Sequence, residues 1–107
     1  MSPAPARTPE QRADALARAL QSRQERARLR QALRDRTISP VEVIRGAEEN
    51  PLWASFRVLW LLESVPGIGP ARAERIMERL GIARSRRLQG LGERQRAALI
   101  DQFGGAA

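Results

Sequence analysis

The residues with the clearest potential for chemistry lie in residues 65–80, where two glycines flank one isoleucine and a helical pattern follows directly. Gly67 and Gly69 have no side chain, so another backbone can approach them closely. Pro70 suits the first position of a helix, because the N–H that it lacks would be unpaired there. A helix start carries unpaired N–H groups and a partial positive charge. The stretch therefore predicts a site for a phosphate group.

Arginine side chains surround this turn. Arg72 lies in the first turn of the expected helix, where its guanidinium can add donors to the same phosphate. Three more arginines fall within residues 84–87, in the connection after that helix, and predict a second phosphate clamp. The structural alternative is that the glycines only permit a tight turn and the arginines only solvate a loop. The basic chain and the helices expected on both sides favour phosphate contact.

The segments on either side of the turn have the pattern of two packed helices. After the turn, Ala73, Ile76, Met77 and Leu80 recur at the i, i+3, i+4, i+7 spacing of one apolar helix face. Before the turn, an apolar segment predicts a partner helix over about 56–64. Together they predict a helix–hairpin–helix unit with basic residues just past the hairpin.

A long basic helix is predicted ahead of this unit. Thr8 is placed to cap it, with Pro9 in the first position and Gln11 able to close a capping box. No Gly or Pro interrupts the pattern before Arg34. Residues 1–7 are rich in Pro and Ala, and we expect them to be disordered.

The apolar residues of this helix change face along its length. Leu16 and Leu20 share one face, while Leu29 and Leu33 share another. The step from Leu20 to Leu29 turns a regular helix by about 900°, so the two faces lie about 180° apart. We expect the second half to dock on the core and the first half to project as a basic arm. The alternative is a solvated helix with Glu–Arg pairs, which the excess of Arg over acid disfavours.

Helix boundary signals divide the rest of the chain. Ser39 predicts the start of a short helix over about 40–48, which ends before Pro51. Gly81 predicts a left-handed end to the helix that follows the turn. A last helix is expected over about 93–103.

Residues 52–56 predict a loop with large apolar groups. We expect Trp53 and Phe56 to cover the core like a lid, and Ser55 to cap the following helix. The alternative for the two aromatic residues is a wedge between the bases of a nucleic acid.

The charge is strongly basic and unevenly distributed. The net charge is +7, and every one of the 19 basic residues is Arg. Residues 1–36 hold nine Arg and four acids, a net of +5; residues 37–64 hold two Arg and four Glu, a net of −2; residues 65–107 hold eight Arg and four acids, a net of +4. This distribution indicates a polyanionic partner for the two ends of the chain.

The composition excludes several classes of site. The chain has no Cys, which excludes disulfides and thiolate metal sites, and no His, which removes the usual general base and the commonest metal ligand. We therefore expect no metal, no cofactor and no enzymatic activity. No apolar run approaches the ~20 residues of a membrane span, and the N-terminus has no signal-peptide pattern. We expect a cytoplasmic protein, with an arm over 1–36 and a core over 37–107.

A set of short motifs extends over nearly the whole chain: Thr8-Pro9-Glu10-Gln11-Arg12, Val65-Pro66-Gly67-Ile68-Gly69, Ala71-Arg72-Ala73, Ile76-Met77-Glu78, Arg86-Arg87-Leu88, Gly90-Leu91-Gly92, Arg94-Gln95-Arg96 and Phe103-Gly104. In this combination the sequence resembles the actinobacterial integration host factor family. Two positions depart from the family pattern, because Pro70 stands where the family usually has Lys, and Gln89 where it often has a basic residue. Pro70 removes a charge and a backbone donor, which leaves more of the phosphate contact to Gly69, Ala71 and Arg72.

The resemblance implies an all-α fold of about five helices, a helix-two-turns-helix core with a long basic N-terminal helix. It implies a nucleoid-associated protein that binds double-stranded DNA with little sequence preference, compacts or bends it, and supports phage integration beside an integrase on the same DNA. A monomer in solution is expected. The residues expected to contact DNA are Gly67, Ile68, Gly69, Ala71, Arg72, Arg75, Arg84, Ser85, Arg86, Arg87 and Arg94, with Arg23, Arg26 and Arg30 on the first helix.

The alternative function is an RNA-binding module. A ribosomal protein of the small-subunit head shares the helix-two-turns-helix element and a Gly-Ile-Gly turn. Its long basic extension normally follows that element, whereas here the basic arm precedes it. The position of the arm therefore favours DNA over RNA.

Overall fold

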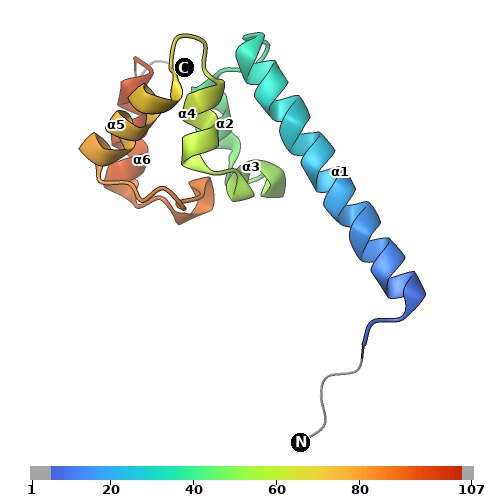
Figure 1. Ribbon diagram of the computed structural model, residues 1–107. Helices are drawn as coiled ribbons and strands as arrows, with labels where there is room; N and C mark the ends of the chain where they lie inside the picture. The colour runs from blue at the N-terminus through green and yellow to red at the C-terminus, as the bar shows by residue number, and fades with distance from the viewer. Residues whose placement is uncertain (1–5, 105–107) are drawn as a thin grey trace, which may run out of the picture.

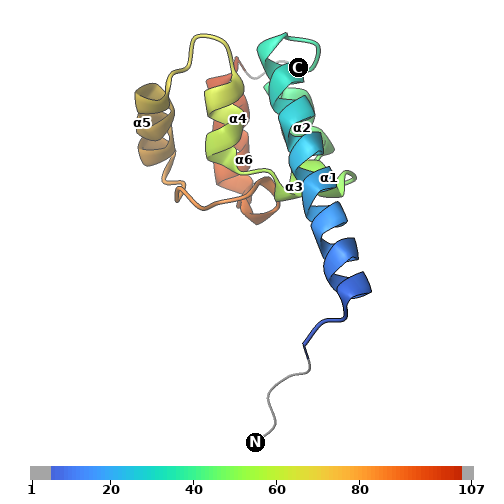
Figure 2. The same ribbon diagram turned by 45° about the vertical axis from the view of Figure 1, so that its right-hand side comes forward.

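The computed structural model describes residues 6–104, and every regular element in that range is helical. The elements in chain order are α1 (Pro9–Arg34), α2 (Pro40–Gly46), α3 (Pro51–Ser55), α4 (Val58–Ser64), α5 (Pro70–Leu80), the single 3₁₀ turn η1 (Leu88–Gly90) and α6 (Glu93–Gln102). Figures 1 and 2 show α1 as a long rod attached to a rounded body formed by the other helices. The all-α fold class is confirmed, and no described helix is both long and apolar enough to cross a bilayer.

The long helix α1 begins and docks as predicted. The Thr8 side chain accepts a hydrogen bond from the Gln11 N–H, and the Gln11 side chain accepts one from the Thr8 N–H, so the capping box is complete. Near its C-terminal end, Leu29 and Leu33 are buried in the core. Leu16 and Leu20 remain 68% and 54% exposed. The first half of α1 therefore projects from the body, as both views show. Most of the segment expected to be disordered, residues 1–5, lies outside the described residues.

The core is arranged around α4, which packs against α1 on one side and α5 on the other (Figure 2). A helix with neighbours on several sides must be apolar nearly all round, and α4 is, with Val58, Leu61 and Leu62 fully buried. The helix α6 closes the body through contacts with α2 and α5. Fully or almost fully buried side chains come from most of the elements: Leu33, Val43, Ile44, Phe56, Val58, Leu61, Leu62, Ala73, Ile76, Met77 and Leu99.

The segment between α2 and α4 differs from the predicted loop. The Asn50 carboxamide oxygen accepts hydrogen bonds from the N–H groups of Leu52 and Trp53, which caps a one-turn helix, α3. Contrary to the prediction, Pro51 does not end the preceding helix. It occupies the first position of α3. The short helix α2 instead ends at Gly46.

Three predictions for residues 55–56 and Trp53 also need correction or refinement. Ser55 does not cap α4, whose N-cap is Arg57; the Ser55 hydroxyl instead donates to the Leu52 carbonyl within α3. Phe56 is not part of a lid, because it is fully buried at the centre of the core. Trp53 is half-buried and packs over Gly46, where a Cβ would come within 2.4 Å of the indole. The contact explains why residue 46 has no side chain.

The helix that follows the turn agrees with its prediction at both ends. Gly69 and Pro70 begin α5, and Gly81 ends it with a left-handed φ of 66°. Ile82 packs back on the last turn, where it is buried and its N–H donates to the Met77 carbonyl at 2.9 Å. The α5 axis is therefore fixed between two glycine-containing connections, one at each end.

Candidate nucleic-acid interface

The turn between α4 and α5 covers residues 65–69. The Ile68 N–H donates to the Val65 carbonyl at 3.1 Å, which closes the turn. Gly67 has a φ of +88°, a conformation that L side chains rarely adopt. Gly69 caps α5 with a φ of −81°, which any residue can adopt. The first glycine is thus required by the backbone, whereas the second is not.

Both glycines face open space. A Cβ built on Gly67 or on Gly69 would meet no atom of the protein within 4 Å. No packing contact inside the described chain occupies the space beside Gly69, whose one internal role is as N-cap of α5, where glycine is favoured over alanine. At such an exposed position without a side chain, the backbone of another molecule can come close.

Backbone donors lie at this surface. The first hydrogen bond within α5 runs from the Ala73 N–H to the Gly69 carbonyl at 2.9 Å. The N–H groups of Ala71 and Arg72 precede it, so they have no carbonyl of the helix to bond. The Arg72 guanidinium folds back over the turn and donates to the Gly67 carbonyl at 3.4 Å. Unpaired donors and a cation therefore meet at one exposed helix start.

The second connection, residues 83–92, is held against the start of α4. The Val58 N–H donates to the Arg86 carbonyl, and the Leu88 N–H to the Phe56 carbonyl, each at 3.0 Å. The Arg87 guanidinium donates to the Ser55 carbonyl at 2.6 Å in a partly buried contact. Arg87 therefore fixes the loop to the body, a contact that the cluster of basic residues gave no sign of.

The other arginines predicted here remain accessible. Arg84 pairs with Glu74 at 2.8 Å, but the two side chains are 74% and 45% exposed, so the pair leaves the guanidinium available to solvent. Arg86 is exposed, and its guanidinium donates to the Gly90 carbonyl at 2.8 Å. Ser85, together with Arg75 on α5 and Arg94 on α6, is exposed as well. Figures 1 and 2 place this connection and the first turn at opposite ends of α5.

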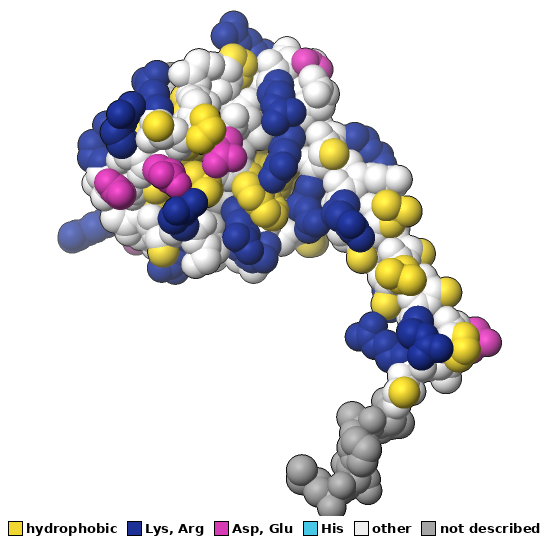
Figure 3. Space-filling model, viewed as in Figure 1, with side chains coloured by type: hydrophobic (Ala, Val, Ile, Leu, Met, Phe, Trp, Pro, Cys, Tyr) yellow, Lys and Arg dark blue, Asp and Glu magenta, His cyan; other side chains and the backbone are white. Residues whose placement is uncertain are grey.

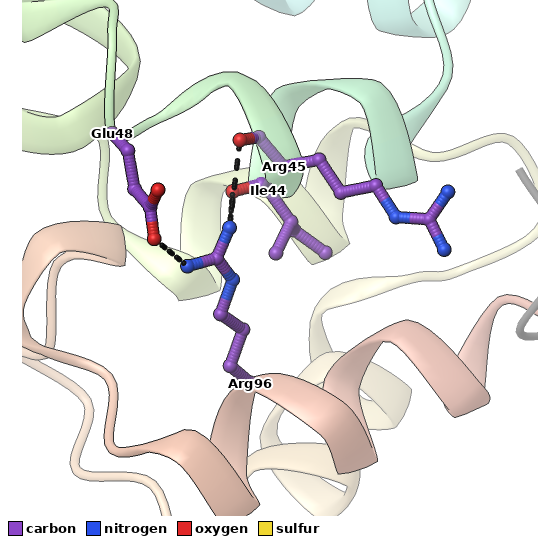
Figure 4. Close-up of polar contacts among 4 residues, drawn as sticks. All are labelled: Ile44, Arg45, Glu48 and Arg96. Atoms are coloured by element: carbon purple, nitrogen blue, oxygen red, sulfur yellow. Dashed lines mark hydrogen bonds and ion pairs between the residues drawn. The ribbon is translucent and has the colours of Figure 1, made fainter.

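One arginine that follows Arg94 has a structural role. The Arg96 guanidinium forms an ion pair with Glu48 at 2.6 Å and donates to the carbonyls of Ile44 and Arg45 at 3.3 and 3.4 Å (Figure 4). These carbonyls lie near the C-terminus of α2, where a cation is favoured by the helix dipole. Arg96 therefore joins α6 to α2, although it lies 48 residues after Glu48 in the sequence.

The predicted residues of the first helix face α4. The guanidiniums of Arg26 and Arg30 lie 5.7 and 4.8 Å from the ring centroid of Trp60, a half-buried residue of α4. Arg57, which precedes α4, lies 5.1 Å from the same ring. Arg23 and Arg34 line the hollow between α1 and Trp60. Trp60, Arg57 and Arg34 were not predicted as parts of a basic site. The three- and four-residue spacing of the α1 arginines could have identified Arg34 as lying on the same helix face as Arg26 and Arg30.

Comparison with known proteins covers almost the whole chain. A protein named integration host factor from Streptomyces coelicolor is 49% identical over 100 residues, which are 94% of each chain. An integration host factor from Mycobacterium tuberculosis is 42% identical over 102 residues, covering 95% of this chain and 97% of that protein. The chain belongs to the actinobacterial integration host factor family.

The integration host factor fold is matched as well. A solved structure described as sIHF bound to an 8-base-pair palindromic DNA is similar with a TM-score of 0.78 and 45% identity, covering 82% of this chain and 99% of that one. Residues 33–103 match the family described as the S13-like H2TH domain. The match begins at Leu33, in the last turn of α1, one of the two leucines that dock this helix on the core.

Proposed function

We propose that the protein is a non-enzymatic, architectural DNA-binding protein that holds the phosphate backbone of duplex DNA. The observation that carries the proposal is the open turn at residues 65–69, where Gly67 and Gly69 leave the surface free of side chains and a helix start presents unpaired donors. The relatives that are integration host factors, and the solved sIHF structure with DNA, support duplex DNA as the ligand.

Phosphate contacts explain a low sequence preference, since they position a protein on the duplex without reading bases. The proposed contacts are Gly67, Ile68, Gly69, Ala71 and Arg72 at the first turn, Arg75 on α5, Arg84, Ser85 and Arg86 at the second connection, Arg94 at the start of α6, and Arg23, Arg26 and Arg30 on α1. Arg87, which the sequence predicted as a contact, instead holds the second connection in place through its bond to Ser55. An α-helix rises 1.5 Å per residue, so the 11-residue α5 separates its two ends by roughly 16 Å. Contacts at separated phosphates can bend or compact DNA, which fits a nucleoid protein that acts as a monomer and supports a phage integrase on the same DNA.

The RNA-binding alternative is not favoured. The helix-two-turns-helix element is shared by both classes, and the domain description itself refers to S13. The relatives that match along nearly their whole length, arm included, are integration host factors. A direct comparison of duplex DNA with folded RNA at equal salt tests the choice.

The test of the proposal is a salt titration of duplex binding by fluorescence anisotropy. Neutralising roughly four to six phosphates predicts a slope of log K against log salt of about −4 to −5. Arg72→Ala should weaken binding equally on unrelated duplexes and reduce the slope by about one unit. The matched control is Arg45→Ala, which removes the same charge from the exposed surface of α2. A slope near zero, or equal effects of the two variants, would contradict the proposal.

A further inference from the structure

A second concentration of positive charge lies between α1 and α4, away from the glycine turn. Its centre is the indole of Trp60, which has three guanidiniums within 6 Å of its ring centroid, those of Arg26, Arg30 and Arg57. Each of these contacts is attractive by itself, because the ring face is electron-rich. Three like charges around one ring also repel one another, and that repulsion grows as the groups leave bulk water.

The long helix supplies a row of cations to this place. Arg23, Arg26, Arg30 and Arg34 are spaced by three, four and four residues, which puts them on one face of α1. They line a hollow of about 400 Å³ with Trp60, Ala27 and Gln31, and no carboxylate is among the lining residues. Figure 3 shows dark-blue side chains gathered where the long helix meets the rounded body. The volume lies in the usual range of ligand sites, about 300–1,000 Å³.

Two donors in the cluster have no partner. The Nε atoms of Arg30 and Arg57 are buried, and neither has a hydrogen-bond acceptor within the described chain. A buried donor without a partner is uncommon in folded proteins and calls for an explanation. The two ion pairs among the described residues, Arg84–Glu74 and Arg96–Glu48, both involve other parts of the molecule. The cluster therefore has an excess of charge and of donors that nothing in the described chain satisfies.

We propose that this pocket, lined by Arg23, Arg26, Arg30, Arg34 and Trp60, with Arg57 beside the same indole, binds a phosphate group. Guanidinium forks match the oxygens of phosphate and hold them by charge-assisted hydrogen bonds. A doubly charged group compensates the like charges around Trp60 better than a singly charged one does. The pocket shares Arg23, Arg26 and Arg30 with the proposed DNA contacts, and in this respect it rests on the proposed function. It goes beyond that function because it adds Arg34 and Arg57 and needs no duplex on Gly69. The phosphate comes either from a second stretch of nucleic-acid backbone or from a free phosphorylated small molecule.

The test uses Trp60 fluorescence and inorganic pyrophosphate. In Trp53→Phe, Trp60 is the only tryptophan of the chain. Pyrophosphate added at constant ionic strength, balanced with sodium chloride, should change the emission saturably. Arg30→Lys and Arg57→Lys keep the charge but lose the planar fork, and each should weaken the midpoint at least about tenfold. The matched control is Arg28→Lys, on the opposite face of α1, which should leave the midpoint unchanged.

A second measurement on the unaltered chain removes dependence on the folding of Trp53→Phe. The Nε–H resonances of Arg30 and Arg57 in a ¹⁵N-labelled sample should shift with pyrophosphate, while that of Arg28 should not. The Arg72→Ala chain should give the same shifts, because the glycine turn is a separate site. This result distinguishes failure of the pocket from failure of the DNA-binding turn.

A third arm identifies the source of the phosphate. If nucleic acid occupies the pocket, a saturating duplex should shift the same two resonances and prevent the pyrophosphate response. If the ligand is a free phosphorylated molecule, duplex and pyrophosphate should bind at the same time. Either of these two results supports the site. A response that sodium chloride reproduces at equal ionic strength, or one that the Arg28 variant loses as the Arg30 variant does, would overturn it.

Discussion

The two connections that flank α5 are both exposed and contain glycine, and both have arginines in or beside them, but the protein holds them in opposite ways. The first, residues 65–69, is closed by one internal backbone bond and leaves both glycines facing open space. The second, residues 83–92, is bonded to the start of α4 through backbone groups and through the Arg87 guanidinium. The first connection is open to a ligand throughout, whereas the second is a joint that Arg87 fixes to the body and that leaves Arg84, Ser85 and Arg86 accessible.

The difference teaches that a basic loop cannot be assigned to a ligand from its charge alone. Arg87 has the same side chain as Arg72, but its contact with Ser55 lies on the inside of the joint. Substitutions in the two connections should therefore separate stability from binding. Loss of stability is expected mainly from Arg87 in the second connection and from Gly67, whose φ is positive, and loss of DNA affinity mainly from Gly69 and Arg72.

The largest effect is expected from Arg87→Ala. It leaves the partly buried Ser55 carbonyl without its donor, and an unsatisfied buried group costs about 1–3 kcal/mol. The free energy of unfolding, measured by urea titration, should fall by about 2 kcal/mol. Arg86→Ala is the matched control, because its bond to Gly90 is exposed. Equal losses in the two variants would mean that the second connection is not held by Arg87.

Gly67→Ala should be the next largest change. The φ of +88° at this residue suits glycine, and an L side chain in a left-handed conformation costs roughly 1–2 kcal/mol. The melting temperature should fall, although a Cβ at this position would touch nothing. A melt that is unchanged in differential scanning calorimetry would show that the turn can adopt another backbone path.

Gly69→Ala separates the two properties most sharply. Its φ of −81° accepts any residue, but alanine is a poorer N-cap than glycine, so the two effects on stability oppose each other and the free energy of unfolding should change by less than about 1 kcal/mol. The added methyl group keeps a phosphate backbone at a distance, and duplex affinity should fall roughly tenfold, the equivalent of about 1.4 kcal/mol. Anisotropy and urea titrations on the same preparation measure both. Unchanged affinity would remove the first turn from the DNA interface.

Arg84→Ala should have the smallest effect on stability. Its ion pair with Glu74 is exposed on both sides, and such pairs contribute about 0–1 kcal/mol. The expected change in the free energy of unfolding is below about 0.5 kcal/mol, measured by urea titration at two salt concentrations. A loss comparable to that of Arg87→Ala would erase the distinction between joint and surface within the second connection.

Features that depend on nearby residues were predictable from the sequence. The capping box at Thr8, the apolar stripe of α5 and the left-handed Gly81 each follow from residues within two helical turns. The exposure of Leu16 beside the burial of Leu29 followed from counting residues along one helix. The short helix α3 was missed because Pro51 was interpreted as a helix end, although Asn50 before it is a strong cap.

Features that depend on distant residues were not predictable. Arg96 reaches Glu48 across 48 residues and Arg87 reaches Ser55 across 32, and no local pattern distinguishes these arginines from solvated ones. The burial of Phe56 and the arginines around Trp60 likewise depend on how α1 and α4 meet. Among the residues proposed to contact DNA, only those of the first turn could therefore be described in chemical detail from the sequence.

The docking of α1 through one end has a consequence for its motion. Starting a helix is unfavourable, whereas extending one adds a hydrogen bond per residue. The turns around Leu29 and Leu33 are held by the core and act as the nucleus for the rest. Amide protons should therefore exchange with solvent progressively faster from Leu29 toward Thr8, with local opening near Leu16 needing far less free energy than global unfolding. A nucleic acid that lies along the free half would flatten this exchange gradient without altering exchange in α4.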